Sequence, residues 1–446
     1  MRRCNALCAP SRSGRTSSMD DTITTLLASV RAEPQADDLE VMRLSMLDWL
    51  AVGLAGCNEP VARITRAMVL AEGGNAQATL MGGGQAPARA AALVNGATSH
   101  ALDYDDTHFA HIGHPAVAVI PAALAMGERE DAPRDKVLRA ALAGCEASVR
   151  IGLLLGRGHY QAGFHQTATA GTFGATIAAG LLAGLNDERM QHALGLAATR
   201  ASGLKSQFGT MGKPYNAGMA AANGLECADL AGLGMMSNPD AVTGVQGFVP
   251  THHGDGDSTE TPGFLMRGVS HKFHACCHGL HAALEALSGL LPIDANKVSD
   301  VQVTTHPRWM SVCNKHAPET GLGAKFSYEA VMALALSGYD TANPATFADE
   351  PMREPAIRSL MRRVDVVTDE KLTETEAKLR IKAGEVFEAH HDLSAEMALE
   401  HRRARVKKKA AILLGDMQAE AAWDVIVSDG PVAALSALLK TSAPSR

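Results

Sequence analysis

Residues 167–185 read TATAGTFGATIAAGLLAGL and form the longest weakly charged run of the chain. The run approaches the length of a membrane span, but Ala, Gly and Thr make up most of it and are only weakly hydrophobic. A helix without a polar face is buried inside a protein. We therefore expect residues 167–185 to lie in a helix at the core of an all-helical domain.

Helical periodicity continues on both sides of this run, through residues 20–260. Within 34–56 and 135–155, apolar residues recur at steps of three and four, as in helices with one buried face. Asp37 and Asp38 lie near the start of the first of these segments, where acids suit the helix dipole. Three further helices are expected over 172–185, 188–201 and 216–233.

A polar, Gly-containing linker, THHGDGDSTETP at 251–262, ends the helical series. A helix near 279–290 follows, and then strand-like segments at 298–305, 364–368 and 377–389, the last with a turn at Gly384. Charged and apolar helices return at 394–414 and 431–439. We therefore predict a mainly α protein with four parts: an extension (1–19), a large helical domain (20–262), a smaller α+β domain (263–393) and C-terminal helices that pack back on the helical domain (394–446).

Composition restricts the function. Of 446 residues, 46% are hydrophobic and 20% charged, which excludes a disordered chain. The net charge of −7 argues against a nucleic-acid partner, and an anionic substrate would need a local cationic pocket. The eight cysteines lack zinc-like pairs and dense disulfide spacing, so we expect reduced thiols and a cytoplasmic protein without a membrane partner.

Common cofactor motifs are missing from the sequence. It has no GxGxxG after a strand, no Walker loop, no GxSxG elbow and no HExxH. Its 18 histidines show no clear zinc spacing, and the segment GDGDS at 254–258 lacks the pattern of an EF-hand. We expect neither a nucleotide nor a metal, and no other cofactor.

The densest chemistry lies at 100–115, HALDYDDTHFAHIGHP, with three acids and four histidines. A polar loop between two helices is the simple alternative. However, acids beside imidazoles fix tautomers and tune pKa for proton transfer, and this segment directly precedes an apolar run. We therefore interpret it as part of an active site.

Four other segments carry candidate residues, although each alone also fits a structural role. They are GFHQTATAGTFGA with His165, MGKPYNAG with Lys213, HKFHACCHGLH with Lys272, His274, Cys277, His278 and His281, and AKFSYEA with Lys325 and Tyr328.

Taken together with DWLAVGLAG (48–56), NGATSHALDYDDTH (95–108), HPAVAVIPAALA (114–125), ALGLAATRASGL (193–204), KPYNAGMAA (213–221) and HKFHACCHGLHAALEAL (271–287), these segments resemble the MmgE/PrpD family from about residue 25 onward. The resemblance implies a large helical domain built from both chain ends and an inserted α+β lid domain. It also implies a homodimer with a cofactor-independent active site between the domains.

By the same resemblance, catalytic positions fall on Asp103, His114, His165, Cys277 and Tyr328, and substrate-binding positions on Thr107, Lys213 and Lys272. The loop after Thr107 is one residue longer than in the decarboxylase branch, so His111 is an alternative to His114. Cys277 stands where the decarboxylases have a second lid histidine, and His278 beside it is expected to point elsewhere. This departure counts against decarboxylation.

The family includes 2-methylcitrate dehydratase, cis-aconitate decarboxylase and iminodisuccinate epimerase. Their substrates are small polycarboxylates with an acidic C–H next to a carboxylate, and the charge left by proton loss needs cationic help. Our first hypothesis is an epimerase of iminodisuccinate. The alternative is a lyase resembling 2-methylcitrate dehydratase, with cis-aconitate decarboxylation less favoured. Outside the enzymes, the hypothesis is a catalytically silent protein that only binds carboxylates.

Overall fold

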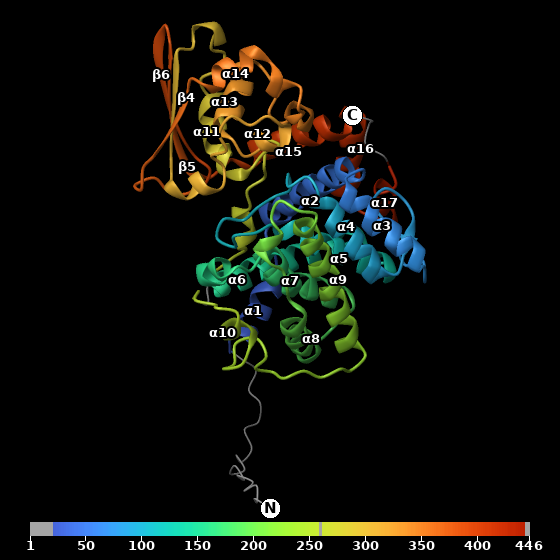
Figure 1. Ribbon diagram of the computed structural model, residues 1–446. Helices are drawn as coiled ribbons and strands as arrows, with labels where there is room; N and C mark the ends of the chain where they lie inside the picture. Colours follow the sequence, from blue (N-terminus) through green and yellow to red (C-terminus); the bar gives the residue numbers. More distant parts are fainter. Residues whose placement is uncertain (1–20, 258–260, 442–446) are drawn as a thin grey trace, which may run out of the picture.

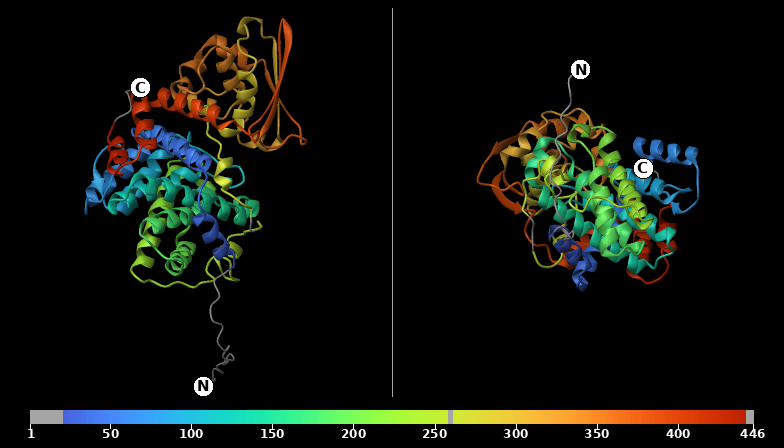
Figure 2. Two further views of the ribbon diagram at one scale, coloured as in Figure 1. Left: turned by 180° about the vertical axis from the view of Figure 1, so that it is seen from behind. Right: turned by 90° about the horizontal axis from the view of Figure 1, so that it is seen from below.

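The structure is a computed structural model that describes residues 21–257 and 261–441. The expected extension at 1–19 lies outside these residues. A large helical domain carries a smaller α+β domain at one end, as Figure 1 shows, and the view from behind in Figure 2 shows the same division. The predicted fold class, mainly α with an added α+β domain, is confirmed.

Helix α7 (Gln166–Leu182) is the centre of the helical domain, and every one of its residues except Leu181 is buried. It packs against α5 (Pro115–Arg129), α6 (Arg134–Ala162) and α9 (Gly212–Gly232). The helix begins at Gln166, as the buried run at 167–185 predicts, and not at 172, where the helical periodicity placed its start. Packing on all sides holds threonines that have a weak helix propensity of their own. The remaining elements of this domain are α1 (Asp21–Arg31), α2 (Ala36–Gly56), α3 (Pro60–Glu72), the short hairpin β1 (Ala78–Thr79) and β2 (Gln85–Ala86), α4 (Ala88–Ser99), α8 (Asp187–Arg200) and α10 (Phe248–Thr251).

Glycine pairs let the core helices touch along their backbones. A Cβ atom on Gly96 of α4 would lie 2.8 Å from the Cα of Gly218 on α9, and one on Gly144 of α6 would lie 2.6 Å from the carbonyl oxygen of Gly174 on α7. A larger residue at these positions would push the helices apart. The contacts explain how a core with few aromatic residues is still densely packed.

The α+β domain is built on a four-stranded sheet with the order β4-β3-β5-β6. Strands β3 (Asp300–Thr305) and β4 (Val364–Thr368) are parallel, whereas β5 (Glu376–Ala383) and β6 (Glu385–Asp392) form an antiparallel hairpin around Gly384, whose φ is 81°. Helices α11 (His281–Ser288), α13 (Tyr328–Leu336) and α14 (Pro355–Met361) lie on one side of the sheet (Figure 1). The short helix α12 (Gly321–Ala324) precedes α13.

The chain then returns to the helical domain through α15 (Leu399–Leu414), α16 (Asp416–Val427) and α17 (Ala433–Leu438). Helix α15 packs on α2, where Arg403 pairs with Glu40 at 2.6 Å and Lys409 pairs with Asp48 at 2.6 Å. The helical domain therefore contains segments from both halves of the sequence. Within residues 21–257 and 261–441, none of the helices combines the length and the apolar character that a membrane crossing requires.

Candidate active site

A cavity of about 720 Å³ lies between the two domains. The helical domain contributes His100–Asp103, which follow α4, and Phe208–Met211 with Lys213, where α9 begins. The α+β domain contributes Ala275–Cys277 and, among other residues, Lys325. Residues from distant parts of the sequence therefore share one cavity, and most of the segments singled out in the sequence contribute to it.

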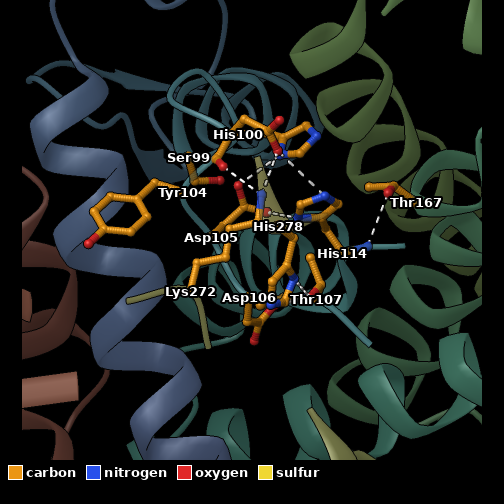
Figure 3. A network of polar contacts seen from close by, with 12 residues as sticks. Ser99, His100, Tyr104, Asp105, Asp106, Thr107, His114, Thr167, Lys272 and His278 are labelled. Carbon is orange, nitrogen blue, oxygen red and sulfur yellow. Dashed lines mark hydrogen bonds and ion pairs between the residues drawn. The ribbon is translucent and has the colours of Figure 1, made fainter. Parts of the chain in front are cut away.

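Asp105 orients two histidines of the segment between α4 and α5, as Figure 3 shows. Its carboxylate lies 2.9 Å from Nδ1 of His100, the C-cap residue of α4, and 2.7 Å from Nδ1 of His114, the N-cap residue of α5. A carboxylate at Nδ1 fixes the proton there and leaves Nε2 as the reactive nitrogen. Nε2 of His100 is buried and has no hydrogen-bond partner among the described residues.

Asp103 joins this pair to two lysines. Its carboxylate lies 2.7 Å from Nζ of Lys213 and 3.0 Å from Nζ of Lys272, which also donates to the Asp103 carbonyl at 2.7 Å. Nε2 of His114 is 3.6 Å away. Desolvation opposes ionisation of Asp103, but Lys213 and Lys272 outweigh it and hold the pKa of Asp103 well below its usual range. The site thus concentrates two ammonium groups around one carboxylate.

Both predicted catalytic histidines are neutral at physiological pH. Burial lowers the pKa of His114 to about 4, although Asp105 opposes this effect. Burial, together with His100 and Lys213, lowers the pKa of His165 well below its usual value. Neutral imidazoles are able to accept a proton or to give one up, depending on the tautomer.

His165 is the N-cap residue of α7 and lies behind the cavity wall. Its ring stacks on His100 with 6.1 Å between centroids and meets the edge of Phe208 at 4.9 Å. The Asn216 amide lies 3.3 Å from Nδ1 of His165. With the amide nitrogen donating to Nδ1, the ring proton is on Nε2, so His165 is a proton donor beside the acceptor His100.

Cys277 is half-buried and lines the cavity. A hydrogen bond from Cys313, with the two sulfurs 3.1 Å apart, lowers the pKa of Cys277 to about 7 against the effect of burial, and Lys272 adds to the lowering. The neighbouring His278 points elsewhere, as expected, because its Nδ1 bonds to Oγ1 of Thr107 at 2.7 Å (Figure 3). Thr107 is therefore engaged by His278 in this structure.

The structure places His114, and not the alternative His111, beside Asp103 and Asp105. It also places Tyr328 outside the residues that line the cavity. The ring of His111 faces α6, where Ser148 Oγ lies 3.5 Å from Nε2, so His114 is the histidine beside Asp103 and Asp105. Tyr328 is buried in the α+β domain, and its hydroxyl donates to the Gly279 carbonyl at 2.8 Å. In this arrangement its hydroxyl does not face the ligand space.

Sequence reasoning did not assign roles to His100, Asp105, Phe208 or Cys313. His100 and Asp105 lie inside the acid- and histidine-rich segment at 100–115, so that segment itself was the available signal. Phe208 and Cys313 carry no signal in the sequence, because only the tertiary fold brings them to His165 and Cys277.

Four possible metal ligands, His100, Asp103, Asp105 and His114, have donor atoms within 4.8 Å of one another. However, the ammonium groups of Lys213 and Lys272 already contact the Asp103 carboxylate. Two adjacent positive charges repel a divalent cation and attract an anion. The chemistry of this cluster therefore favours an anionic ligand over a metal ion.

Comparison with known proteins gives two matches to sequence models of one family. The MmgE/PrpD N-terminal domain matches residues 21–261, and the MmgE/PrpD C-terminal domain matches residues 274–423. Similar proteins include cis-aconitate decarboxylase of Aspergillus terreus, 28% identical over 366 residues that cover 74% of each chain. The human enzyme of the same name is 30% identical over 46% of this chain and 44% of its own, and the mouse enzyme is 26% identical over 72% and 69%.

Proposed function

Because the chain belongs to the MmgE/PrpD family, we propose that it is a lyase that acts on a small polycarboxylate in the cavity between its domains. The related proteins described above are named as decarboxylases, which are lyases. This supports a lyase over our first hypothesis, an epimerase of iminodisuccinate. The observation that carries the proposal is the contact of Lys213 and Lys272 with one carboxylate beside neutral imidazoles.

The two lysines provide the binding energy for an anionic substrate. An incoming carboxylate is an acceptor of the same kind as Asp103 and competes with it for Lys213, which lines the cavity. Hydrogen bonds between charged groups are stronger than neutral ones, and burial, as at Lys272, strengthens them further. Charge that develops on the substrate during bond cleavage is stabilised by the same ammonium groups.

The residues around the cavity supply the proton transfers. Loss of CO2 leaves an electron pair on carbon, which takes a proton from a group on the cavity wall such as the Cys277 thiol. In a dehydration, Nε2 of His100 or His114 instead accepts the proton from the carbon next to the substrate carboxylate. A proton donor then protonates the hydroxyl on the adjacent carbon, which leaves as water. Asp105 keeps His100 and His114 in the tautomer that the dehydration needs.

Dehydration is the second candidate, and Cys277 favours it. A thiol with a pKa of about 7 on the cavity wall is able to protonate a leaving hydroxyl near neutral pH. The two lyase reactions differ in their products, which are CO2 in one case and water with a new C=C bond in the other.

A substrate panel in deuterated water tests the proposal. The protein is incubated with cis-aconitate, 2-methylcitrate and iminodisuccinate, while CO2 release, ultraviolet absorbance and NMR spectra are recorded. We expect CO2 or a new alkene from a tricarboxylate. Deuterium at the α-carbon without elimination would instead support an epimerase, and saturable binding without any reaction would support a silent binding protein.

Matched variants show whether the reaction belongs to this cavity. Lys213→Met should abolish most of the turnover, because Lys213 contacts Asp103 and lines the cavity. Lys371→Met, which removes the same charge from an exposed position in the α+β domain, should behave like the parent. Equal turnover of Lys213→Met and the parent would place the reaction elsewhere.

A further inference from the structure

Two cysteines meet at the wall of the cavity. Cys277 precedes the turn that leads into α11, and Cys313 follows the short helix Pro307–Ser311. Their sulfur atoms are 3.1 Å apart, about 1 Å more than in a disulfide bond. Cys277 is half-buried and faces the cavity, whereas Cys313 is fully buried behind it. Any reagent from the cavity therefore reaches Cys277 first.

The surroundings distinguish Cys277 from its neighbour in the sequence. Cys313 donates a hydrogen bond to the sulfur of Cys277, and Lys272 adds positive charge, so that the pKa of Cys277 is about 7 despite desolvation. Burial raises the pKa of Cys276 far above its ordinary value. The thiolate is the nucleophilic form of cysteine, so Cys277 is the reactive residue of the group.

We propose that Cys277 and Cys313 form a thiol oxidation site that reacts with small hydroperoxides and closes to a disulfide. This chemistry needs an attacking thiolate that the peroxide can reach and a second thiol in contact with it. Cys277 on the cavity wall provides the first, and Cys313 behind it provides the second.

The reaction with hydrogen peroxide proceeds in two balanced steps. The Cys277 thiolate attacks one peroxide oxygen, the O–O bond breaks, and the leaving hydroxide takes a proton to become water, so that Cys277 becomes a sulfenic acid. The Cys313 sulfur then attacks the Cys277 sulfur, the S–O bond breaks, and the hydroxyl leaves as water with the Cys313 proton. Overall, two thiols are oxidised to a disulfide and one peroxide is reduced to two waters.

The disulfide would change the cavity wall. It removes the Cys277 thiol from the ligand space and draws its sulfur toward the buried Cys313. The expected loss of turnover rests on the proposed function, but formation of the bond does not. A chemical readout therefore tests the site even if none of the tried substrates reacts.

The experiment treats the full chain with hydrogen peroxide, alkylates the remaining thiols, digests with trypsin and analyses the peptides by mass spectrometry. Cleavage after Lys and Arg leaves Cys277 in peptide 273–297 and Cys313 in peptide 309–315. We expect these two peptides to become linked with the loss of two hydrogens, and dithiothreitol to separate them. Where turnover is measurable, it should fall and return in parallel.

Two variants make the result specific. Cys276→Ala should still form the linked peptides, because Cys276 shares peptide 273–297 but is not the reactive thiol. Cys313→Ala should form no link. Because it also removes the hydrogen bond that lowers the pKa of Cys277, oxidation of Cys277 should be slower and should end at sulfinic acid, which dithiothreitol does not reverse. Linkage that disappears in Cys276→Ala, or sulfinic acid without linkage in the parent protein, would overturn the proposal. Peroxide that leaves both thiols free to react with the alkylating agent would overturn it as well.

Discussion

At the scale of single residues, Asp103 has an unusual conformation. Its φ is 51°, in the left-handed region that residues other than glycine rarely adopt. Lys272 binds both its carbonyl and its carboxylate, so the strained backbone and the charge are held by one side chain. Strained residues persist where their surroundings over-determine them, often at functional sites. This conformation keeps the carboxylate between Lys213 and Lys272.

We predict that Asp103→Asn folds normally but loses roughly 10²- to 10⁴-fold in turnover. Asparagine tolerates the left-handed conformation and keeps the side-chain size, so the change removes mainly the charge between the lysines. Turnover and the thermal midpoint are measured together. Asp131→Asn is the matched control, because Asp131 is also left-handed, with φ 48°, but is exposed and outside the cavity. A lowered midpoint with preserved turnover would indicate a structural role for Asp103.

We also predict that Lys272→Met mainly raises KM. Loss of one charge-assisted contact to a carboxylate costs on the order of 2–3 kcal/mol, or roughly 30- to 150-fold in affinity. Methionine fills most of the space of the buried stem, so packing is largely retained. Steady-state kinetics of this variant are compared with those of Lys297→Met, which removes an exposed lysine. A parental KM would show that Lys272 is not part of the anion site.

At the scale of elements, local patterns predicted much of the fold. The buried run at 167–185, the strand at 364–368 and the hairpin at Gly384 agree with α7, β4 and β5–β6, because each has a clear periodicity or turn residue. Helix α16 was not expected, and the Tyr328 hydroxyl binds Gly279 rather than facing the cavity. Such contacts join segments far apart in the chain, and no local pattern encodes them.

Helix α15 fixes the active-site segment from behind. The buried Nζ of Lys409 donates to the Tyr104 carbonyl at 2.6 Å and pairs with Asp48 of α2 at 2.6 Å. Tyr104 lies between Asp103 and Asp105 in the sequence and, in Figure 3, points away from His114 toward α2. Lys409 therefore connects α15 with α2 and with the backbone of the active-site segment at Tyr104.

We predict that Lys409→Met lowers the free energy of unfolding by about 3–5 kcal/mol, because it leaves the buried Asp48 without its partner. Denaturant unfolding measures the change. Lys407→Met, on the same helix, removes a more exposed pair with Glu420 and should cost less than about 1 kcal/mol. The double variant Asp48→Leu/Lys409→Met should regain part of the loss, since it removes both charges. Equal effects of the two single variants would contradict an anchoring role.

At the scale of the whole molecule, many histidines are buried inside the helical domain and at the domain boundary. Burial lowers the pKa of His111 to about 3 and that of His159 to about 4. Burial also lowers the pKa of six further histidines, which are His108, His114, His165, His271, His278 and His281. Among the described residues, histidines with a lowered pKa outnumber the acids whose pKa burial raises, which are Asp48, Asp106, Glu128 and Glu146.

The excess of histidines with a lowered pKa over acids with a raised pKa decides how the free energy of unfolding changes with pH. A histidine with a depressed native pKa stays neutral in the fold, while the unfolded chain takes up a proton below about pH 6.5. Each such histidine contributes stability above pH 6.5 that is lost as the pH falls toward its native pKa. Asp48 and Asp106, with native pKa values of about 6 and 8, act in the opposite direction and offset only part of this loss.

We therefore predict that the free energy of unfolding falls steadily from pH 6.5 to pH 4.5, as measured by denaturant unfolding at half-unit steps. His111→Gln should reduce the slope by about 1.4 kcal/mol per pH unit, because the pKa of His111 in the fold lies below this whole window. The slope is the readout, since the substitution also changes packing next to Gly152 and shifts the stability at every pH. His401→Gln, at an exposed position on α15, should leave the slope nearly unchanged. A stability that rises on acidification, or an equal slope for His111→Gln and the parent, would show that buried neutral histidines do not control the acid limb.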